Sequence, residues 1–396
     1  MKIFLGFRKL KKVRAMALVL LVSLILTLQP IGVLASPNSD DGIELGLNCK
    51  SAILMEASTG KVLYERSADD ALPPASVTKV MTLLLIMEAI EAGKISYGDK
   101  VRASANACSM GGSQIYLEEN EEMSVEDLVK SVVIASANDA AVALAEYVAG
   151  SEEAFVALMN QKAQELGMKN SFFENTNGLD DSTQKHLTSA RDIAIMSREL
   201  IKYPKITEFS SIWMDSIRNG EFGLTNTNRL VRYYRGATGL KTGSTSKAGF
   251  CISATAERDG MTLICVIMGA PSRDVRNAAA VSLLDYGFSN YGVCKINQEQ
   301  LPDIPVLKGT VASVGATCKE FSQVIKKSDK NRIEKVLNVP EALDAPISSG
   351  DVIGNVVYKI DGKEIGRSDV IATSGVERIN FGRMLLLFLK KCCEIL

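Results

Sequence analysis

The feature that most constrains this chain is an apolar, helix-forming segment that follows closely on a serine and a lysine. The apolar run covers residues 80–90 and contains neither glycine nor proline, which predicts a buried helix. Pro73 and Pro74 lie just before it, where a missing N–H costs a helix little. Ser76 therefore falls in or near the first helical turn, and Lys79, three residues later, lies on the same face.

A hydroxyl and an amine held together at the start of a helix can act as nucleophile and base. The same Ser-x-x-Lys spacing occurs from Ser182 to Lys185 and from Ser244 to Lys247, but neither of these pairs opens a long apolar helix. The helix context therefore selects the first pair as the candidate nucleophile and base. The alternative is an ordinary helix serine with a solvated lysine one turn later.

The first 35 residues have the pattern of an export signal. A basic region ends at Arg14, residues 15–28 are mostly apolar, and small residues precede Ser36 at a possible cleavage point. We predict a cleaved signal peptide, with an uncleaved membrane anchor as the alternative; either way the body of the chain is exported. Six of the 45 basic residues lie in 1–35, which leaves 39 against 46 acidic residues. This acidic balance predicts no nucleic-acid partner.

Scarce histidine and scattered cysteine limit the chemistry. His186 is the one histidine, so a Ser-His-Asp or Cys-His mechanism would have to use it, and a zinc enzyme would lack its usual ligands. None of the eight cysteines forms a C-x-x-C pair, which argues against a structural zinc site. Most cysteines are predicted to be small buried hydrophobes. We therefore expect no metal and no cofactor, and a mechanism based on lysine.

The order of the predicted elements indicates the architecture of a first domain. Strand-like segments at 51–55, 61–65, 248–256 and 261–269 lie early and late, with helices predicted between them. This order predicts an α+β domain, residues 45–295, in which one antiparallel sheet joins both ends and helices flank it. Residues 205–235 are predicted to be irregular, with short strands. The predicted helices include residues 139–147, 152–166, 189–200 and 274–286.

The rest of the chain predicts a second domain and a tail. Residues 297–305 are polar and contain two prolines, which predicts a linker, and short strand-like runs in 304–375 predict a small all-β domain. Residues 376–396 mix large apolar residues with four basic ones. Their apolar run is too short to span a bilayer, so we predict an amphipathic helix on a membrane surface. A tail packed on its own domain is the alternative.

Two further motifs follow Ser76-Val77-Thr78-Lys79 in chain order. Ser136-Ala137-Asn138 lies at a predicted junction between two helices, which distinguishes it from the similar Ser104-Ala105-Asn106. Lys241-Thr242-Gly243 occurs once, at the start of a predicted strand. Ser-x-x-Lys, Ser-Asp-Asn and Lys-Thr-Gly together are a motif set of penicillin-binding proteins and class A β-lactamases, and here alanine replaces the aspartate.

These residue types suit acyl transfer. Burial and the cation of Lys241 would lower the pKa of Lys79, so that a neutral amine could take the proton of Ser76. Ser136 can relay a proton to the leaving amine, and the Asn138 amide can orient the lysine and hold a substrate carbonyl. Proton transfer and the positioning of the reacting groups would therefore be shared by Lys79, Lys241, Ser136 and Asn138.

The strand motif suits substrate binding. Lys241 and Thr242 offer a cation and a hydroxyl to a substrate carboxylate. Gly243 leaves room for a substrate to lie along the strand edge. The backbone N–H groups of Ser76 and Ser244 can form an oxyanion hole, whose loss typically costs about 10²–10³ in rate.

With these motifs the chain resembles a serine-type D-alanyl-D-alanine carboxypeptidase, a low-molecular-mass penicillin-binding protein, over about residues 45–295. The resemblance implies a β-lactamase/transpeptidase-like fold. It also implies that the protein acts at the outer face of the cytoplasmic membrane. It further implies removal of the terminal D-alanine from peptidoglycan stem peptides that end in D-Ala-D-Ala, and acylation of Ser76 by β-lactam antibiotics.

Arg276 stands where the family places an arginine near the substrate carboxylate. Ser244 stands where relatives often have an aromatic residue or histidine, which leaves side-chain contributions to deacylation open. Further matching stretches are residues 136–146, 177–180, 188–192 and 239–250.

Other functions stay open at this point. A class A β-lactamase needs a Glu-x-x-Leu-Asn stretch between the second and third motifs, whereas the match from Glu334 to Asn338 follows the third motif. A catalytically idle wall-binding domain is the second alternative, which the intact Ser76, Lys79 and Lys241 oppose. Endopeptidase action on peptidoglycan cross-links fits the same residues.

Overall fold

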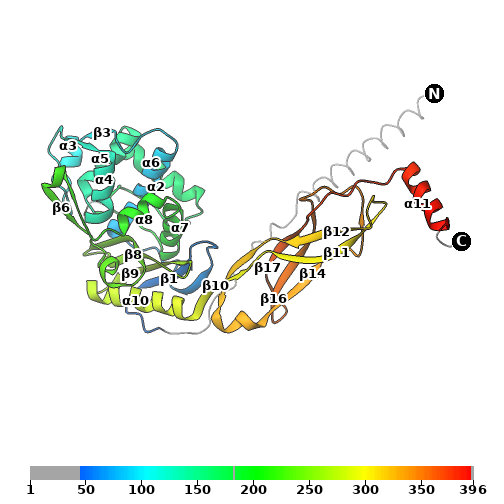
Figure 1. Cartoon of the computed structure of the whole chain (residues 1–396). Helices are drawn as coiled ribbons and strands as arrows, with labels where there is room; N and C mark the ends of the chain where they lie inside the picture. Colours follow the sequence, from blue (N-terminus) through cyan, green and yellow to red (C-terminus); the bar gives the residue numbers. More distant parts are fainter. Residues whose placement is uncertain (1–44, 182, 394–396) are drawn as a thin grey trace, which may run out of the picture. The chain divides into compact units, whose positions relative to one another are not determined.

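The computed structural model describes residues 45–181 and 183–393 (Figure 1). The predicted signal peptide, residues 1–35, lies outside the described residues. Helices and strands are mixed as far as residue 290, and strands dominate from 291 to 372. The prediction of an α+β domain followed by an all-β domain is therefore confirmed.

One antiparallel sheet organises the first domain. Its strand order is β2-β1-β9-β8-β7, and all neighbouring strands run antiparallel. Strand β1 lies between its hairpin partner β2 and strand β9 from the end of the domain, with Ile53 opposite Val266. The predicted joining of early and late strands is confirmed. The strands are β1 (Ser51–Glu56), β2 (Val62–Arg66), β7 (Ala237–Thr245), β8 (Gly249–Arg258) and β9 (Met261–Ala270).

The two faces of this sheet carry different helices, because successive side chains of a strand point to opposite faces. In β1, Ile53 packs into the core that contains helix α2, whereas Leu54 packs into the core that contains helix α10 (Arg273–Asn290). Figure 1 shows α10 on one side of the sheet and helix α2, with the helices around it, on the other. The two cores therefore hold the sheet between two helical layers.

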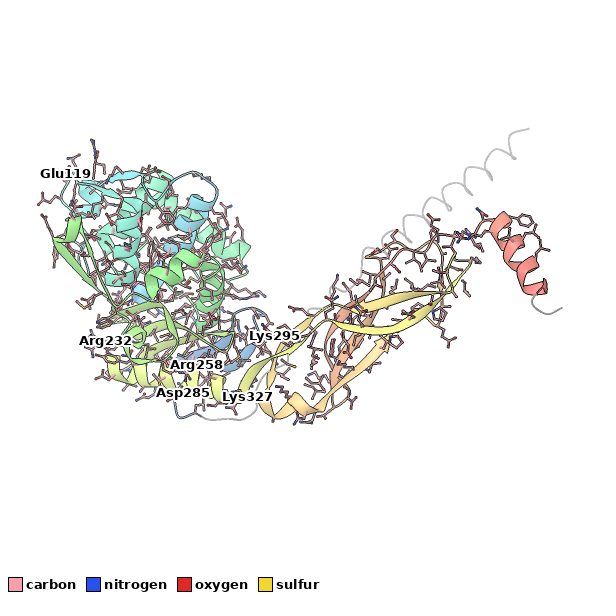
Figure 2. The ribbon with its side chains drawn as sticks, in the orientation of Figure 1. Glu119, Arg232, Arg258, Asp285, Lys295 and Lys327 are labelled. Atoms are coloured by element: carbon pink, nitrogen blue, oxygen red, sulfur yellow. The ribbon has the colours of Figure 1, made fainter. Side chains whose placement is uncertain are left out.

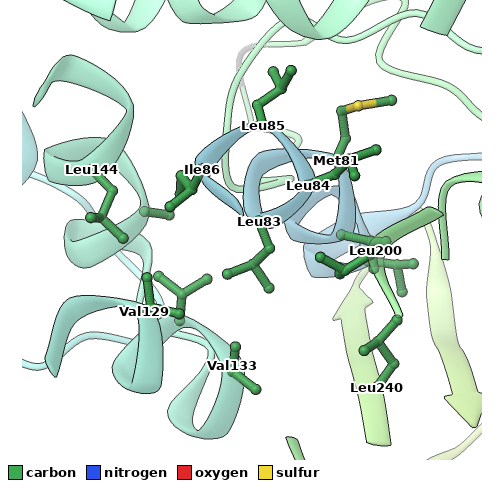
Figure 3. Packing of buried hydrophobic residues seen from close by; sticks show 14 of the residues in the cluster. Met81, Leu83, Leu84, Leu85, Ile86, Val129, Val133, Leu144, Leu200 and Leu240 are labelled. Atoms are coloured by element: carbon green, nitrogen blue, oxygen red, sulfur yellow. The ribbon is translucent and has the colours of Figure 1, made fainter. Parts of the chain in front are cut away.

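Helix α2 (Lys79–Glu91) lies at the centre of the larger helical layer. Ten of its 13 residues are buried, so neighbours surround it on all sides. Figure 3 shows its leucines between Val129 and Val133 on one side and Leu200 and Leu240 on the other. Each fully buried leucine contributes about 1.5–3 kcal/mol relative to an exposed one. The predicted buried helix is confirmed, and its strong packing fixes the residues at its start.

Besides Ser104, which caps the short helix α3 (Ala105–Cys108), serine residues begin four helices of this domain. The hydroxyls of Ser124, Ser151, Ser189 and Ser272 each accept a hydrogen bond from the backbone N–H three residues later. Such an N-cap satisfies an otherwise unpaired donor and typically contributes about 1 kcal/mol. The helices that follow these serines are α4 (Val125–Lys130), α6 (Glu152–Glu165), α7 (Ala190–Leu200) and α10.

The stretch 205–235, predicted as irregular with short strands, contains short helices as well. Each of its elements has at most seven residues, too few to show a clear helical period in the sequence. Residues 94–123 are also loop-rich, with one short helix. The elements are β3 (Lys100–Arg102), α3 (Ala105–Cys108), β4 (Glu122–Ser124), α8 (Pro204–Ser210), β5 (Met214–Ile217), η3 (Arg218–Gly220), β6 (Phe222–Thr225) and α9 (Leu230–Tyr233).

Arg258 fastens the β8–β9 hairpin to helix α10, and Figure 2 labels it together with Asp285. Its guanidinium lies 4.4 Å from the ring centre of Tyr234, 4.6 Å from that of Phe288 and 3.6 Å from the Asp285 carboxylate. Cation–aromatic contacts at exposed sites contribute about 0.5–1 kcal/mol each. Helix α10, which carries Arg276, is thereby fixed against the sheet.

The second domain is built from strands. Strands β10 and β13 form a pair, and six other strands follow the order β14-β16-β17-β12-β11-β15. In its core the rings of Phe321 and Tyr358 stack with centres 4.0 Å apart. The strands are β10 (Tyr291–Ile296), β11 (Glu299–Leu307), β12 (Ser313–Cys318), β13 (Phe321–Lys326), β14 (Ile333–Asn338), β15 (Leu343–Asp344), β16 (Val352–Ile360) and β17 (Lys363–Ala372), with the 3₁₀ turn η4 (Lys327–Arg332).

The linker predicted at residues 297–305 is wrong, because most of this stretch belongs to strand β11. The proline signal was misleading for a physical reason. Pro302 lies at the irregularity between Leu301 and Ile304, where the register shifts and a backbone donor is not needed for the ladder. A proline at a bulge therefore interrupts the ladder without ending the strand.

The six cysteines from Cys49 to Cys318 have free thiols, and four of these six are buried. The prediction that most cysteines act as small buried hydrophobes is confirmed for this part of the chain. The buried ones are Cys251, Cys265, Cys294 and Cys318.

Helix α11 (Phe381–Cys393) ends the described chain. Several of its large apolar side chains are exposed, including Phe381, Met384 and Leu389. In the described ranges, helices long and apolar enough to span a membrane are absent. The predicted terminal helix is thus present, and its use at a membrane surface remains a prediction.

Candidate active site

Ser76 lies in a single 3₁₀ turn, η1 (Ala75–Thr78), that leads directly into helix α2. Thr78 donates its hydroxyl hydrogen to the carbonyl oxygen of Ala75 over 2.8 Å, which closes the turn around the serine. Ala75 has a φ of +49°, so the chain bends sharply just before the serine. The predicted placement of Ser76 in or near the first helical turn is confirmed, and the residue is partly exposed.

Lys79 extends from the first position of α2 to a point beside Ser76. Its Nζ lies 3.0 Å from Ser76 Oγ, 2.5 Å from Asn138 Oδ1 and 2.8 Å from the carbonyl oxygen of Asn177. The two carbonyl oxygens can only accept hydrogen bonds, whereas the serine hydroxyl can also donate one. A neutral amine, with two N–H groups and a lone pair, fits these three partners.

The surroundings favour that neutral amine. Burial lowers the pKa of Lys79 well below its usual value, and the cation of Lys241 lowers it further, while Asp139 opposes both. Burial and the nearby Arg276 lower the pKa of Lys241 itself to about 7. Two buried lysines near one another therefore make protonation of the first one costly.

The Ser-Ala-Asn motif lies where two helices meet. A π-helical turn, η2 (Ser131–Ala135), ends at Ser136, which has left-handed backbone geometry with a φ of +65°. Helix α5 (Asn138–Ala149) begins two residues later, so the predicted helix junction is confirmed. Asn138 donates from Nδ2 to the carbonyl oxygen of Gly111 over 2.6 Å, which orients Oδ1 toward the lysine. Ser136, which shortly precedes Asn138 in the chain, is also buried.

The Lys-Thr-Gly motif lies on β7, the last strand of the sheet order. Gly243 packs directly against the turn that carries Ser76, because a Cβ placed there would lie 2.7 Å from Ser76 N and 2.9 Å from Val77 N. Real Cβ atoms do not approach backbone nitrogens this closely, so glycine is required by space. The hydroxyl of Thr242 donates to Thr227 Oγ1 over 2.9 Å.

Two predicted binding residues have different surroundings. Ser244 is exposed on β7 opposite Phe250 of β8. Arg276 is buried on α10 and donates to Asn277 Oδ1 over 2.8 Å and to the Cys251 carbonyl oxygen over 3.4 Å. Its charge acts on Lys241, and burial lowers the pKa of the arginine to about 10. Arg276 is thus held by hydrogen bonds to its own helix and to β8, the strand that pairs with β7.

Sequence reasoning missed several groups that contact the site. Asn177 contributes a backbone carbonyl oxygen to Lys79, and a backbone atom leaves no mark in the residue type. Thr227 comes from the stretch that was predicted as irregular. Asp180 accepts hydrogen bonds from Thr245 and, through its carbonyl oxygen, from Lys247. The signals for the 177–180 turn were the turn-forming residues of the stretch 175–181 and its match to relatives.

A serine paired with a buried lysine, next to an edge strand that carries Lys-Thr-Gly, is the arrangement of the penicillin-recognising serine enzymes. The antiparallel sheet between helical layers and the all-β second domain agree with that class. The chain belongs to the D-alanyl-D-alanine carboxypeptidase family, whose profile matches residues 38–272. The profile of the penicillin-binding protein 5 C-terminal domain matches residues 293–378. The predicted family and its enzyme class, a serine-type carboxypeptidase, are confirmed.

Relatives extend over nearly the whole chain. D-alanyl-D-alanine carboxypeptidase DacF of Bacillus subtilis is 41% identical over 385 residues, which cover 96% of this chain and 97% of that protein. D-alanyl-D-alanine carboxypeptidase DacA of Escherichia coli is 32% identical over 358 residues and covers 87% of each chain.

Solved structures agree with this fold. Penicillin-binding protein 5 from Haemophilus influenzae has a TM-score of 0.71 at 31% identity and covers 84% of this chain and 98% of its own. A penicillin-binding protein from Listeria monocytogenes, solved in its ampicillin-bound form, has a TM-score of 0.58 at 31% identity. It covers 62% of this chain and 100% of its own.

Proposed function

We propose that this enzyme removes the terminal D-alanine from peptidoglycan pentapeptides through an acyl-enzyme on Ser76, and that β-lactams acylate the same hydroxyl. The observation that carries the proposal is the 3.0 Å contact between the fully buried Lys79 Nζ and Ser76 Oγ. Burial lowers the pKa of Lys79 and so favours its neutral amine, which can accept the serine proton as the hydroxyl attacks.

The proton then has a short route to the leaving group. Ser76 Oγ bonds to the carbonyl carbon of the penultimate D-alanine, and the hydroxyl proton passes to Lys79. As the peptide C–N bond breaks, Ser136 relays a proton to the departing D-alanine amine. Asn138 holds the lysine and a substrate carbonyl during this step. Water then hydrolyses the ester and restores the serine.

Strand β7 and its neighbours bind the substrate. Lys241 and Thr242 recognise the terminal carboxylate, with Arg276 adding positive charge nearby. Gly243 lets the peptide lie along the strand edge, and the N–H groups of Ser76 and Ser244 stabilise the oxyanion. The partners that follow from this chemistry are stem peptides ending in D-Ala-D-Ala and β-lactam antibiotics.

The test uses a protein without residues 1–35 and 379–396 and a peptide ending in D-Ala-D-Ala. Release of free D-alanine together with covalent labelling by a fluorescent penicillin is the expected result. Fast turnover of penicillin without D-alanine release would instead indicate a β-lactamase. A protein that neither labels nor releases D-alanine would be a catalytically idle domain.

The close approach of Gly243 to the nucleophile turn leads to a quantitative prediction. We expect Gly243→Ala to slow acylation by penicillin on the order of 10²-fold, because the added Cβ must displace Ser76 and misplacement of about 1 Å costs that much. Stopped-flow labelling with a fluorescent penicillin measures the rate. Gly223→Ala on β6 is the matched control, since open space surrounds that position. Equal rates for the two variants would contradict this role.

The domain organisation completes the proposal. We assign residues 1–35 to a cleaved signal peptide, 45–295 to the carboxypeptidase domain, 304–375 to the small β domain and 376–396 to an amphipathic membrane-associating segment. An exported enzyme with this tail would act at the outer face of the cytoplasmic membrane. In α11, Phe381, Met384, Leu385 and Leu389 have the spacing of one helical face and are exposed.

Removing residues 379–396 is therefore expected to abolish binding to anionic vesicles. Basic residues next to a bulky apolar face suit an anionic surface, so the loss in bound fraction should be at least about ten-fold. Cosedimentation with phosphatidylglycerol vesicles measures it, and neutral phosphatidylcholine vesicles serve as the comparison. D-alanine release from a soluble peptide should stay unchanged. Undiminished vesicle binding by the shortened protein would rule out the tail as the anchor.

A further inference from the structure

His186, the one histidine of the chain, belongs to none of the three motifs and yet contacts Thr78 of the first. It is 5% exposed and sits in a short segment that is paired on both sides. Leu187 pairs with Phe172, and Thr188 pairs with Leu72, a few residues before the nucleophile turn. The backbone that directly follows His186 is therefore held by two neighbouring segments.

Both ring nitrogens of His186 make hydrogen bonds. Nε2 lies 2.7 Å from Thr78 Oγ1, and Nδ1 accepts from the backbone N–H of Glu174 over 3.0 Å. Thr78 gives its own hydroxyl hydrogen to the Ala75 carbonyl oxygen, so it accepts from the histidine. This network assigns a neutral imidazole with its proton on Nε2.

These two bonds join two segments that both contact Lys79. Thr78 is the last residue of the turn that carries Ser76, and it directly precedes the lysine. Glu174 precedes the turn in which the Asn177 carbonyl oxygen accepts from Lys79 Nζ. One imidazole therefore links the nucleophile side and the acceptor side of the lysine amine.

The same junction is tightly packed. Gly178 has a φ of +86°, and a Cβ at this position would overlap the Ala75 carbonyl oxygen and lie 2.8 Å from Thr78 Oγ1. The turn that contains Asn177 thus lies directly against the turn that contains Ser76. The two turns are in close contact, so a change at the imidazole would shift both of them.

We propose that His186 is a positioning residue, which sets the distance between the Lys79 amine and the Ser76 hydroxyl by holding these two turns together. The inference rests on the proposed acyl-enzyme mechanism. The histidine touches neither of the two reacting side chains in the hydrogen-bond network, and it acts through Thr78 and the Glu174 backbone. Its effect should therefore appear in the rate of acylation and not in the recognition of the ligand.

Two further observations agree with this role. An imidazolium could not accept the Glu174 N–H, and burial lowers the pKa of His186 to about 4, which keeps the ring neutral in the working range. The ring also packs edge-on against Phe173 with centres 5.7 Å apart. A purely structural residue would need only this packing, so shape and hydrogen bonding can be separated by substitution.

The test compares His186→Phe, which keeps an aromatic ring and loses both hydrogen bonds, with His186→Gln, which can donate to Thr78 and accept from Glu174. Each full-length protein, in detergent, is mixed with a fluorescent penicillin, and the limiting acylation rate is separated from the prior binding constant. We expect His186→Phe to lower the limiting rate on the order of 10²-fold with the binding constant nearly unchanged. His186→Gln should recover most of that loss.

A second pair of variants keeps the test decisive if the phenylalanine protein does not fold. Thr78→Val removes the hydroxyl that the imidazole holds, and Thr78→Ser retains it. We expect the valine variant to be slow and the serine variant to approach the wild-type rate. Thr78→Val combined with His186→Phe should be no slower than the slower single variant, because both remove the same link.

Three results would overturn the inference. Wild-type acylation rates in a folded His186→Phe protein would show that the link is not needed. Equal slowness of the glutamine and phenylalanine variants, or of Thr78→Ser and Thr78→Val, would show that shape and not hydrogen bonding matters. An unlabelled wild-type protein would refute the proposed acyl-enzyme and this inference with it, whereas the first two results leave the proposed function intact.

Discussion

Ser76→Ala is expected to abolish D-alanine release and penicillin labelling while leaving the fold intact. The Ser76 side chain packs into no apolar core and only its hydroxyl contacts Lys79, so its loss removes the attacking atom and little else. Residues that act as one catalytic unit carry most of the rate, and we expect a drop of at least about 10³-fold. D-alanine release from a D-Ala-D-Ala peptide measures the activity, and a melting curve measures the fold.

The second Ser-x-x-Lys pair supplies the matched control. Ser182, which lies outside the described residues, has the same spacing to Lys185. Ser182→Ala should retain wild-type D-alanine release and wild-type penicillin labelling. Residual labelling of Ser76→Ala at the wild-type rate, with loss of labelling in Ser182→Ala, would transfer the nucleophile to the other pair.

The sequence could predict those parts of the molecule that depend on local pattern. Residues 80–90 are apolar on every side, and only a buried helix satisfies such a run, so α2 and the position of Ser76 followed from it. Strand-like runs early and late in the domain predicted the shared sheet, because short apolar runs bounded by turn residues are typical of strands that are buried on both faces, as β1 is. The helix junction at Ser136 was predictable from the cap residues and apolar spacing around it.

The remaining parts depend on contacts between distant segments. The Asn177 carbonyl, 98 residues from Lys79 in the chain, is a backbone group and any residue type would offer it. His186 contacts Thr78 across 108 residues, and from the sequence it was simply an unassigned histidine. Strand β11 was mistaken for a linker, because a bulge can hold a proline only in the context of the paired strand.

Lys79→Arg is expected to be as inactive in acylation as Ser76→Ala, although it keeps a long basic side chain at this position. Arginine cannot be deprotonated in proteins, so it cannot take the serine proton. Loss of a general base costs about 10²–10⁴-fold. The limiting acylation rate with a fluorescent penicillin measures the effect. Wild-type acylation by the arginine variant would show that the lysine acts as a cation and not as a base.

The pH profile of the wild-type enzyme tests the same role without a substitution at Lys79. Only the neutral amine accepts the proton, so the limiting acylation rate should rise with pH and level off above the pKa of Lys79. Because burial and Lys241 lower that pKa, the midpoint should fall well below the usual lysine value of 10.5. Lys241→Gln removes the second cause and should move the midpoint upward. It should still remain below 10.5, since burial is the larger cause. A midpoint that does not move would separate the two lysines and leave burial alone to keep the amine neutral.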